Sequence, residues 1–135
     1  MKRLTNLSLI IVLTVLFVNM MGCSSTNEVS SNTYSFTQEE EKQFFNLAYD
    51  SLEDSLQNNI IDSEKGEITV FKSGSKFEIF TNKNNERKNI KDIQTISVTF
   101  ATKKESKLKS IQVYLDENGE NVLGFITENK KGSSN

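Results

Sequence analysis

The spacing of apolar residues changes once along this 135-residue chain, near residue 60. From Phe45 to Ile60 they recur every three or four residues, which is the spacing of one face of an α-helix. From residue 67 to residue 128, apolar and polar residues alternate instead, as in half-buried β-strands. The sequence therefore predicts an α+β domain over residues 37–128, in which one helix covers one face of an antiparallel sheet.

The start of the helix is marked by Thr37 and Glu40, which have the spacing of a capping box. Acidic residues at positions 39–41 suit the positive end of a helix dipole. The apolar periodicity continues up to Asn58-Asn59, a pair that is typical of a helix end. We therefore expect one long helix from Gln38 to Asn59.

The alternating region predicts a meander of four to five strands. Ser73-Gly74 favours a tight turn, so residues 67–72 and 76–81 are expected to pair as a hairpin. Residues 82–89 are an expected charged loop. Three more strands are expected at residues 94–103, 108–116 and 122–128, and residues 129–135 are an expected disordered tail.

The two faces of this sheet differ. One face would pack under the helix, with Ile68, Val70, Phe77 and Ile79 among its members, and the other would carry Phe71, Phe80, Tyr114 and Phe125. Exposed aromatic patches mark protein interfaces, so these four are candidate partner-binding residues. Phe80→Ser or Tyr114→Ser is then expected to spare folding and weaken binding. The alternative is that the sheet curls or another segment covers them.

A second candidate surface is basic. Lysine and arginine are concentrated between residues 83 and 109, on two loops and their flanks. Such a cluster can meet wall teichoic acid, anionic lipid or an acidic partner, although solvated turns are often charged. The candidate residues are Lys83, Arg87, Lys88, Lys103, Lys104 and Lys107.

The N-terminal region reads as an export signal. Lys2 and Arg3 precede a ten-residue apolar stretch at positions 9–18, which is shorter than the ~18 residues of a membrane span. Gly22-Cys23 follows and resembles the lipobox of bacterial lipoproteins, in which the cysteine is acylated and cleavage occurs before it. We expect residues 1–22 to be a signal peptide and residues 23–36 to be a lipidated Cys23 with a flexible tether. The alternative is an ordinary secretory signal with a chance cysteine.

The composition argues against most catalytic chemistry. The chain has no histidine and one cysteine, so acylation of Cys23 would leave neither an imidazole nor a thiol. Asp50 and Asp54 fit a solvated helix face, and residues 116–120 fit a turn better than a calcium loop. A net charge of −2 is not typical of a nucleic-acid binder. We expect no enzyme activity, no cofactor, no metal site and no nucleic-acid partner.

With its Gly22-Cys23 anchor, short tether, helix and following strands, the chain resembles the cystatin-like-fold lipoproteins of Gram-positive bacteria. The resemblance implies a lipid-anchored binding domain on the outer face of the cell membrane that contacts another envelope protein. Some such lipoproteins are carried on conjugative or other mobile elements, which implies a role such as excluding redundant transfer. Cystatin-type protease inhibition is not implied, because the chain lacks proline and tryptophan. NTF2-like and PepSY-like domains share the element order, which leaves a small-ligand-binding module open.

Overall fold

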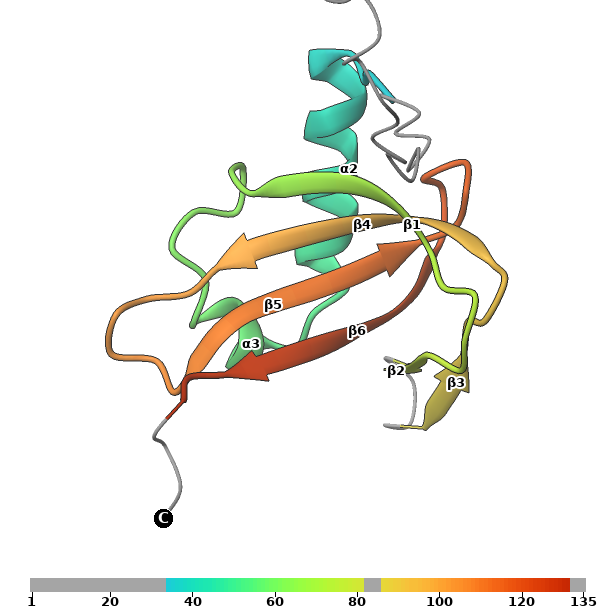
Figure 1. Ribbon diagram of the computed structural model, residues 1–135. Coiled ribbons are helices and arrows are strands. Elements are labelled where there is room, and N and C mark those ends of the chain that lie inside the picture. The colour runs from blue at the N-terminus through green and yellow to red at the C-terminus, as the bar shows by residue number, and fades with distance from the viewer. Residues whose placement is uncertain (1–33, 82–85, 132–135) are drawn as a thin grey trace, which may run out of the picture. The chain divides into compact units, whose positions relative to one another are not determined.

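A computed structural model describes residues 34–81 and 86–131, which form an α+β fold. A six-stranded antiparallel sheet carries one helix across one face (Figure 1). The predicted class is therefore confirmed at that level. Residues 1–33, 82–85 and 132–135 lie outside the described residues. The predicted signal peptide and most of the predicted tether fall in the first of these ranges.

The helical region begins as predicted and ends earlier. Helix α2 spans Gln38–Asp50, and the capping box is present: the Glu40 N–H donates to Thr37 Oγ1 (3.2 Å), and the Thr37 N–H donates to Glu40 Oε2 (2.8 Å). The expected continuation to Asn59 is wrong, because Glu53 is extended and a separate short helix, α3, spans Asp54–Gln57. The apolar spacing persists across the break because Leu52 and Ile60 both reach the core that α2 packs on.

The sheet has four long strands and two short ones. Its order is β1-β4-β5-β6-β2-β3, so β4, β5 and β6 form a consecutive meander, with β1 on one side and β2 and β3 on the other. The bounds are β1 Glu67–Lys72, β2 Glu78–Phe80, β3 Arg87–Asn89, β4 Gln94–Ala101, β5 Leu108–Leu115 and β6 Val122–Asn129.

Three sequence predictions about this sheet are wrong, and the first is the number of strands, which is six rather than the expected four to five. The hairpin between residues 67–72 and 76–81 does not form: β1 pairs along all six residues with β4, whereas β2 pairs with β3 and joins β6 through Phe80 opposite Phe125. The expected loop at 82–89 contains β3. Ser73-Gly74 therefore begins the connection from β1 to β2 and is not the turn of a hairpin between these two strands.

The main core lies between α2 and the sheet. Phe44, Phe45 and Ala48 of α2 pack on side chains of the central strands, several of them fully excluded from solvent. The strand residues of this core are Ile96, Val98, Phe100, Ile111, Val113 and Leu115. Burial of this set is the dominant stabilising contribution to the fold.

A smaller core lies on the opposite face. Ile79, Ile90 and Tyr114 are its buried members, and Phe71 and Phe77 pack against them. Most of its cover comes from residues 73–81 and 86–93, which we call the β2–β3 arm. Phe77 and Ile79 were expected under the helix and lie here instead, because the arm folds over the second face.

Gly124 allows the arm to approach β6 closely. Its φ is +154°, and a Cβ at this position would meet the carbonyl oxygen of Phe80. A side chain here would therefore push β2 away from β6.

Lys130, directly after β6, is hydrogen-bonded to the loop between β4 and β5. Its Nζ donates to the carbonyl oxygens of Lys103 (3.1 Å), Lys104 (2.9 Å) and Ser106 (2.7 Å), and its N–H donates to Lys107 (3.0 Å). The expected disordered tail is thus wrong for residues 129–131, since Asn129 ends β6 and Lys130 binds the β4–β5 loop.

Candidate functional site

The aromatic residues predicted to bind a partner do not form one exposed face. Tyr114 is only 2% exposed and packs on Phe71, with 5.4 Å between ring centroids. Phe80 and Phe125 contact each other (6.2 Å), and Phe125 packs against the core under α2. The expectation that Tyr114 is exposed is therefore wrong, because the β2–β3 arm curls over that part of the sheet.

The basic residues are also divided. Arg87 and Lys88 lie on β3, whereas Lys103, Lys104 and Lys107 lie in the β4–β5 loop at the other end of the sheet (Figure 1). The Lys103 Nζ donates to the carbonyl oxygen of Asn58 (2.7 Å). The structure thus gives two separate basic regions, and Lys83 is outside the described residues. Gly22 and Cys23 are outside them too.

The acidic turn between β5 and β6 is held by Asp116. Its carboxylate accepts hydrogen bonds from the Glu120 N–H (2.9 Å) and the Asn121 side-chain amide (2.6 Å). Burial acts to raise the pKa of Asp116, but these hydrogen bonds bring it below its usual value. In the part of the chain that the structure describes, no cluster of three or more acidic, histidine or cysteine side chains is placed to hold a metal ion.

β1 presents the longest unpaired strand edge of the sheet among the described residues. β1 ends the strand order on its side, and no described strand pairs with its outer edge. The opposite end of the sheet is β3, which has only three residues, all exposed. A long unpaired edge is a template for another strand, and a short charged edge is not.

The register identifies which backbone groups of β1 face outward. Ala101 of β4 accepts a hydrogen bond from the Ile61 N–H (3.1 Å) on the side of β4 where β1 lies. Backbone direction alternates along a strand, so Thr99, Ser97 and Thr95 also face β1, opposite Glu67, Thr69 and Phe71. The N–H and C=O groups that point away from the sheet therefore belong to Ile68, Val70 and Lys72.

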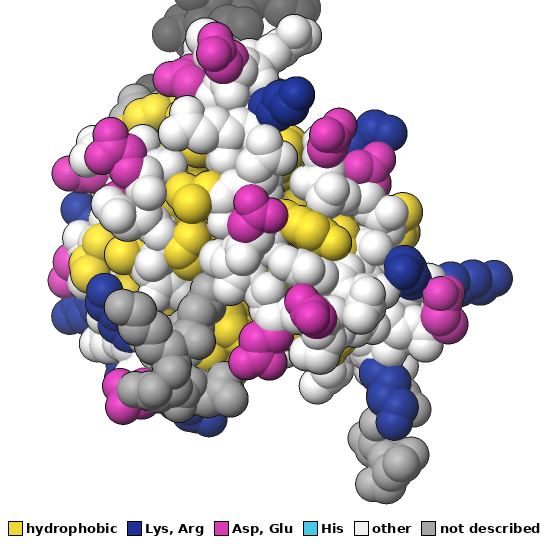
Figure 2. All heavy atoms as spheres, turned by 180° about the vertical axis from the view of Figure 1, so that it is seen from behind, with side chains coloured by type: hydrophobic (Ala, Val, Ile, Leu, Met, Phe, Trp, Pro, Cys, Tyr) yellow, Lys and Arg dark blue, Asp and Glu magenta, His cyan; other side chains and the backbone are white. Residues whose placement is uncertain are grey.

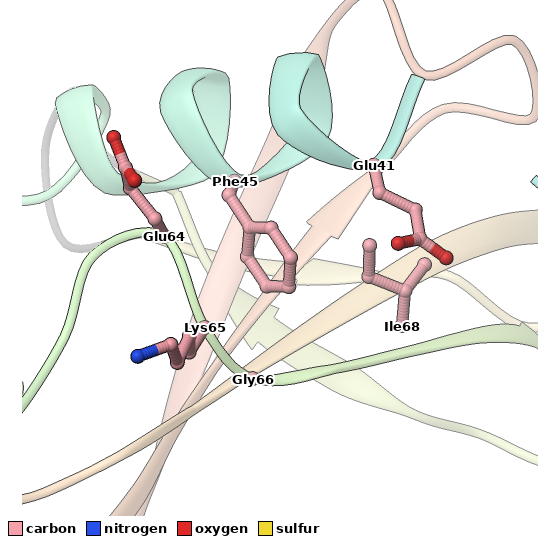
Figure 3. Close-up of a pocket in the computed structure, with 6 residues that line it drawn as sticks. All are labelled: Glu41, Phe45, Glu64, Lys65, Gly66 and Ile68. Atoms are coloured by element: carbon pink, nitrogen blue, oxygen red, sulfur yellow. The ribbon is translucent and has the colours of Figure 1, made fainter. Parts of the chain in front are cut away.

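A groove of about 360 Å³ lies beside this edge, between α2 and β1. Phe45 and Ile68 form its apolar floor, and the Glu41 and Glu64 side chains lie on either side of Phe45 (Figure 3). Gly66 and Lys65 complete the lining.

The loop that carries Glu64 is held in place locally. The Asp62 carboxylate accepts a hydrogen bond from the Glu64 N–H (3.0 Å) and forms an ion pair with Lys65 (3.0 Å). Hydrogen bonding by Lys65 is the largest effect lowering the pKa of Asp62. Lys65 is therefore engaged by Asp62. Among residues 34–81 and 86–131, no hydrogen bond or ion pair engages the Glu41 or Glu64 carboxylate.

Sequence reasoning missed this site. The predicted meander also left residues 67–72 at one end of the sheet, but it paired them with residues 76–81 instead of β4, and no sequence pattern indicated a groove beside them. The four central residues of β1, at positions 68–71, carry no charge and no proline. Natural edge strands commonly carry a charge or a proline that blocks further pairing, so an edge strand without them is open to a partner strand.

Comparison of the chain with protein-family models, with curated proteins and with solved structures finds no match. Within residues 34–81 and 86–131, no helix is both long enough and apolar enough to cross a membrane. The β1 edge and the groove beside it are therefore the features of the described residues that bear on function.

Proposed function

We propose that this chain is a non-enzymatic binding module that recognises an extended segment of another envelope protein by adding it as a strand to β1. The observation that carries this proposal is the six-residue edge of β1, which no strand within residues 34–81 and 86–131 pairs with and along which three residues direct their backbone groups outward. In strand addition, main-chain hydrogen bonds supply affinity and side-chain pockets supply specificity. The groove between α2 and β1 is such a pocket.

We further propose that the module is anchored through acylated Cys23 to the outer face of the cell membrane of a Gram-positive bacterium. The support is the Lys2-Arg3 start, the short apolar stretch and the Gly22-Cys23 pair. The order of a helix followed by antiparallel strands agrees with the proposed likeness to cystatin-like lipoproteins. Exclusion of incoming conjugation machinery is one form that binding to an envelope protein would take.

The geometry favours this proposal over a small-ligand module. A ligand cavity of the NTF2-like kind would lie between helix and sheet. Between α2 and the central strands that space is filled by side chains, among them Phe45 and Phe100, whose ring centroids are 6.0 Å apart, and the groove that remains lies beside the edge of β1.

Strand addition is tested by photocrosslinking in cells, with a crosslinking amino acid at the exposed position Thr69. We expect a discrete adduct, which Val70→Pro abolishes and Val70→Ala retains. Proline removes an outward N–H while leaving the β1–β4 hydrogen bonds in place, and alanine controls for the lost side chain. Lys72→Pro provides a second outward-facing position. An adduct that survives both prolines in folded protein contradicts strand addition.

Anchoring is tested separately with Cys23→Ser. We expect this variant to leave the detergent-rich phase in Triton X-114 partitioning and to lose incorporation of labelled palmitate, because the thiol is the acylation point. Ser24→Ala serves as the matched control and is expected to partition like the unaltered protein. Retention of label by Cys23→Ser would rule out the proposed anchor.

A further inference from the structure

We infer that the strand added at β1 presents an arginine or lysine side chain to the groove between Glu41 and Glu64. The inference rests on the proposed strand addition and specifies the chemistry of the partner segment. The partner is an extended peptide with a cationic residue on the side that faces α2.

The fold determines where this side chain would lie. A strand paired with β1 lies ~4.8 Å from it, and its alternate side chains point to the α2 face. Figure 1 shows α2 crossing behind β1 and continuing past its edge. A residue opposite Ile68 on that face would therefore lie beneath the first half of α2, where Glu41 and Phe45 line the groove.

The lining suits a long cationic side chain. Phe45 and Ile68 can contact its methylene groups, and the Glu41 carboxylate, which Figure 3 shows next to Ile68, can accept a hydrogen bond from its charged end. Glu64 adds negative charge on the other side of Phe45. The one basic residue of the lining, Lys65, forms its ion pair with Asp62, and the negative charge of Glu64 has a smaller effect that raises the Lys65 pKa. An anionic side chain would be repelled by both carboxylates.

Acidic side chains also lie on the surface around α2. Seen from the α2 side, aspartate and glutamate side chains lie both in the middle of the surface and at its margins, and most lysine and arginine side chains lie at the margins (Figure 2). Three consecutive glutamates begin α2 at positions 39–41. The field around the groove therefore favours a cationic partner.

The chain itself does not supply this side chain from its N-terminal tether. Residues 24–36 contain no lysine or arginine, and their single charged residue is Glu28. A glutamate near Glu41 and Glu64 would be repelled. A separate cationic segment fits the groove better.

The test uses the full chain, 15N-labelled in detergent micelles, and acetylated, amidated nine-residue peptides of alternating threonine and serine. The central residue of each peptide is arginine, lysine, glutamine or glutamate. We expect the amide signals of Ile68, Val70 and Lys72 to shift on titration. We also expect Kd to be at least about tenfold lower for arginine or lysine than for glutamine, and highest for glutamate.

Substitutions in the groove identify the source of this preference. In the double variant Glu41→Gln/Glu64→Gln, we expect the ratio of the Kd of the glutamine peptide to the Kd of the arginine peptide to fall to about one, because the carboxylates that favour arginine are gone. Glu39→Gln, on the outer side of α2, is the matched control and is expected to keep the ratio.

The outcomes separate the two proposals. Equal binding of arginine and glutamine peptides that Val70→Pro abolishes would overturn the cationic preference and leave strand addition in place. Arginine-selective binding that Val70→Pro does not affect would overturn strand addition and this inference with it. No shift with any peptide at millimolar concentration overturns both. A particle mass of two chains that Val70→Pro reduces to one would assign the edge to a second copy instead.

Discussion

Gly124→Ala is expected to lower the free energy of unfolding by about 3 kcal/mol. The new Cβ would meet the Phe80 carbonyl oxygen and lie 3.0 Å from Ile79 Cδ1, in a backbone conformation that only glycine adopts easily. Phe80 opposite Phe125 is the single register pair that joins β2 to β6. The measurement is urea denaturation followed by circular dichroism.

Gly74→Ala is the matched control. A Cβ at Gly74 would meet nothing within 4 Å, so this change is expected to alter stability by less than about 0.5 kcal/mol. Hydrogen exchange adds a local measurement, because the Ile90 N–H donates to Phe77 within the arm (2.8 Å). Equal stability of the two alanine variants would contradict close docking of the arm on Gly124.

Tyr114→Ser is expected to destabilise the fold by about 3 to 5 kcal/mol, the range for removing a buried aromatic side chain. The ring is 2% exposed and contacts Phe71 and Phe77, with centroids 5.4 and 5.6 Å away. This result would reverse the sequence-based expectation that the substitution spares folding. Thermal unfolding of the variant measures it.

Tyr114→Phe separates the ring from the hydroxyl. It keeps the aromatic contacts and removes the hydrogen bond that the hydroxyl donates to Gln112 (3.1 Å), so a loss of only about 1 kcal/mol is expected. If Tyr114→Ser were as stable as Tyr114→Phe, the second core would not require the ring.

The same hydroxyl gives a dependence on alkaline pH. Burial raises the pKa of Tyr114 above its ordinary value of 10.0. A raised pKa means that the unfolded chain loses this proton first, so the contribution of Tyr114 to stability is present below pH 10 and is lost as pH rises toward the folded pKa. When the pH is raised above 10, the free energy of unfolding of Tyr114→Phe is expected to fall less than that of the unaltered chain, as urea denaturation at each pH would measure.

Local features were predictable from sequence, and long-range pairing was not. The Thr37–Glu40 capping box and the strand at 67–72 depend on neighbouring residues and occur as predicted. The choice of β4 rather than β2 as the partner of β1 depends on Phe71 and Phe77 both packing near Tyr114, more than 35 positions along the chain. No local pattern encodes that contact.

The candidate site shows the same limit. The predicted meander left residues 67–72 at one end of the sheet but assigned them the wrong neighbouring strand, so the backbone groups of this strand that face outward could not be identified from sequence. The groove further requires Glu41 from α2 and Glu64 from a loop held by Asp62 to meet beside Ile68. Each of these residues alone reads as an ordinary solvated charge.

The strand order has a consequence for folding kinetics. β2 and β3 precede β4, β5 and β6 in the chain, yet they join the sheet only through β6. The β2–β3 arm therefore has no strand of the remaining sheet to pair with until residues 122–129 are available. Since long-range pairing is slow to form, docking of the arm is expected to be a late step of folding, after the helix has settled on the meander.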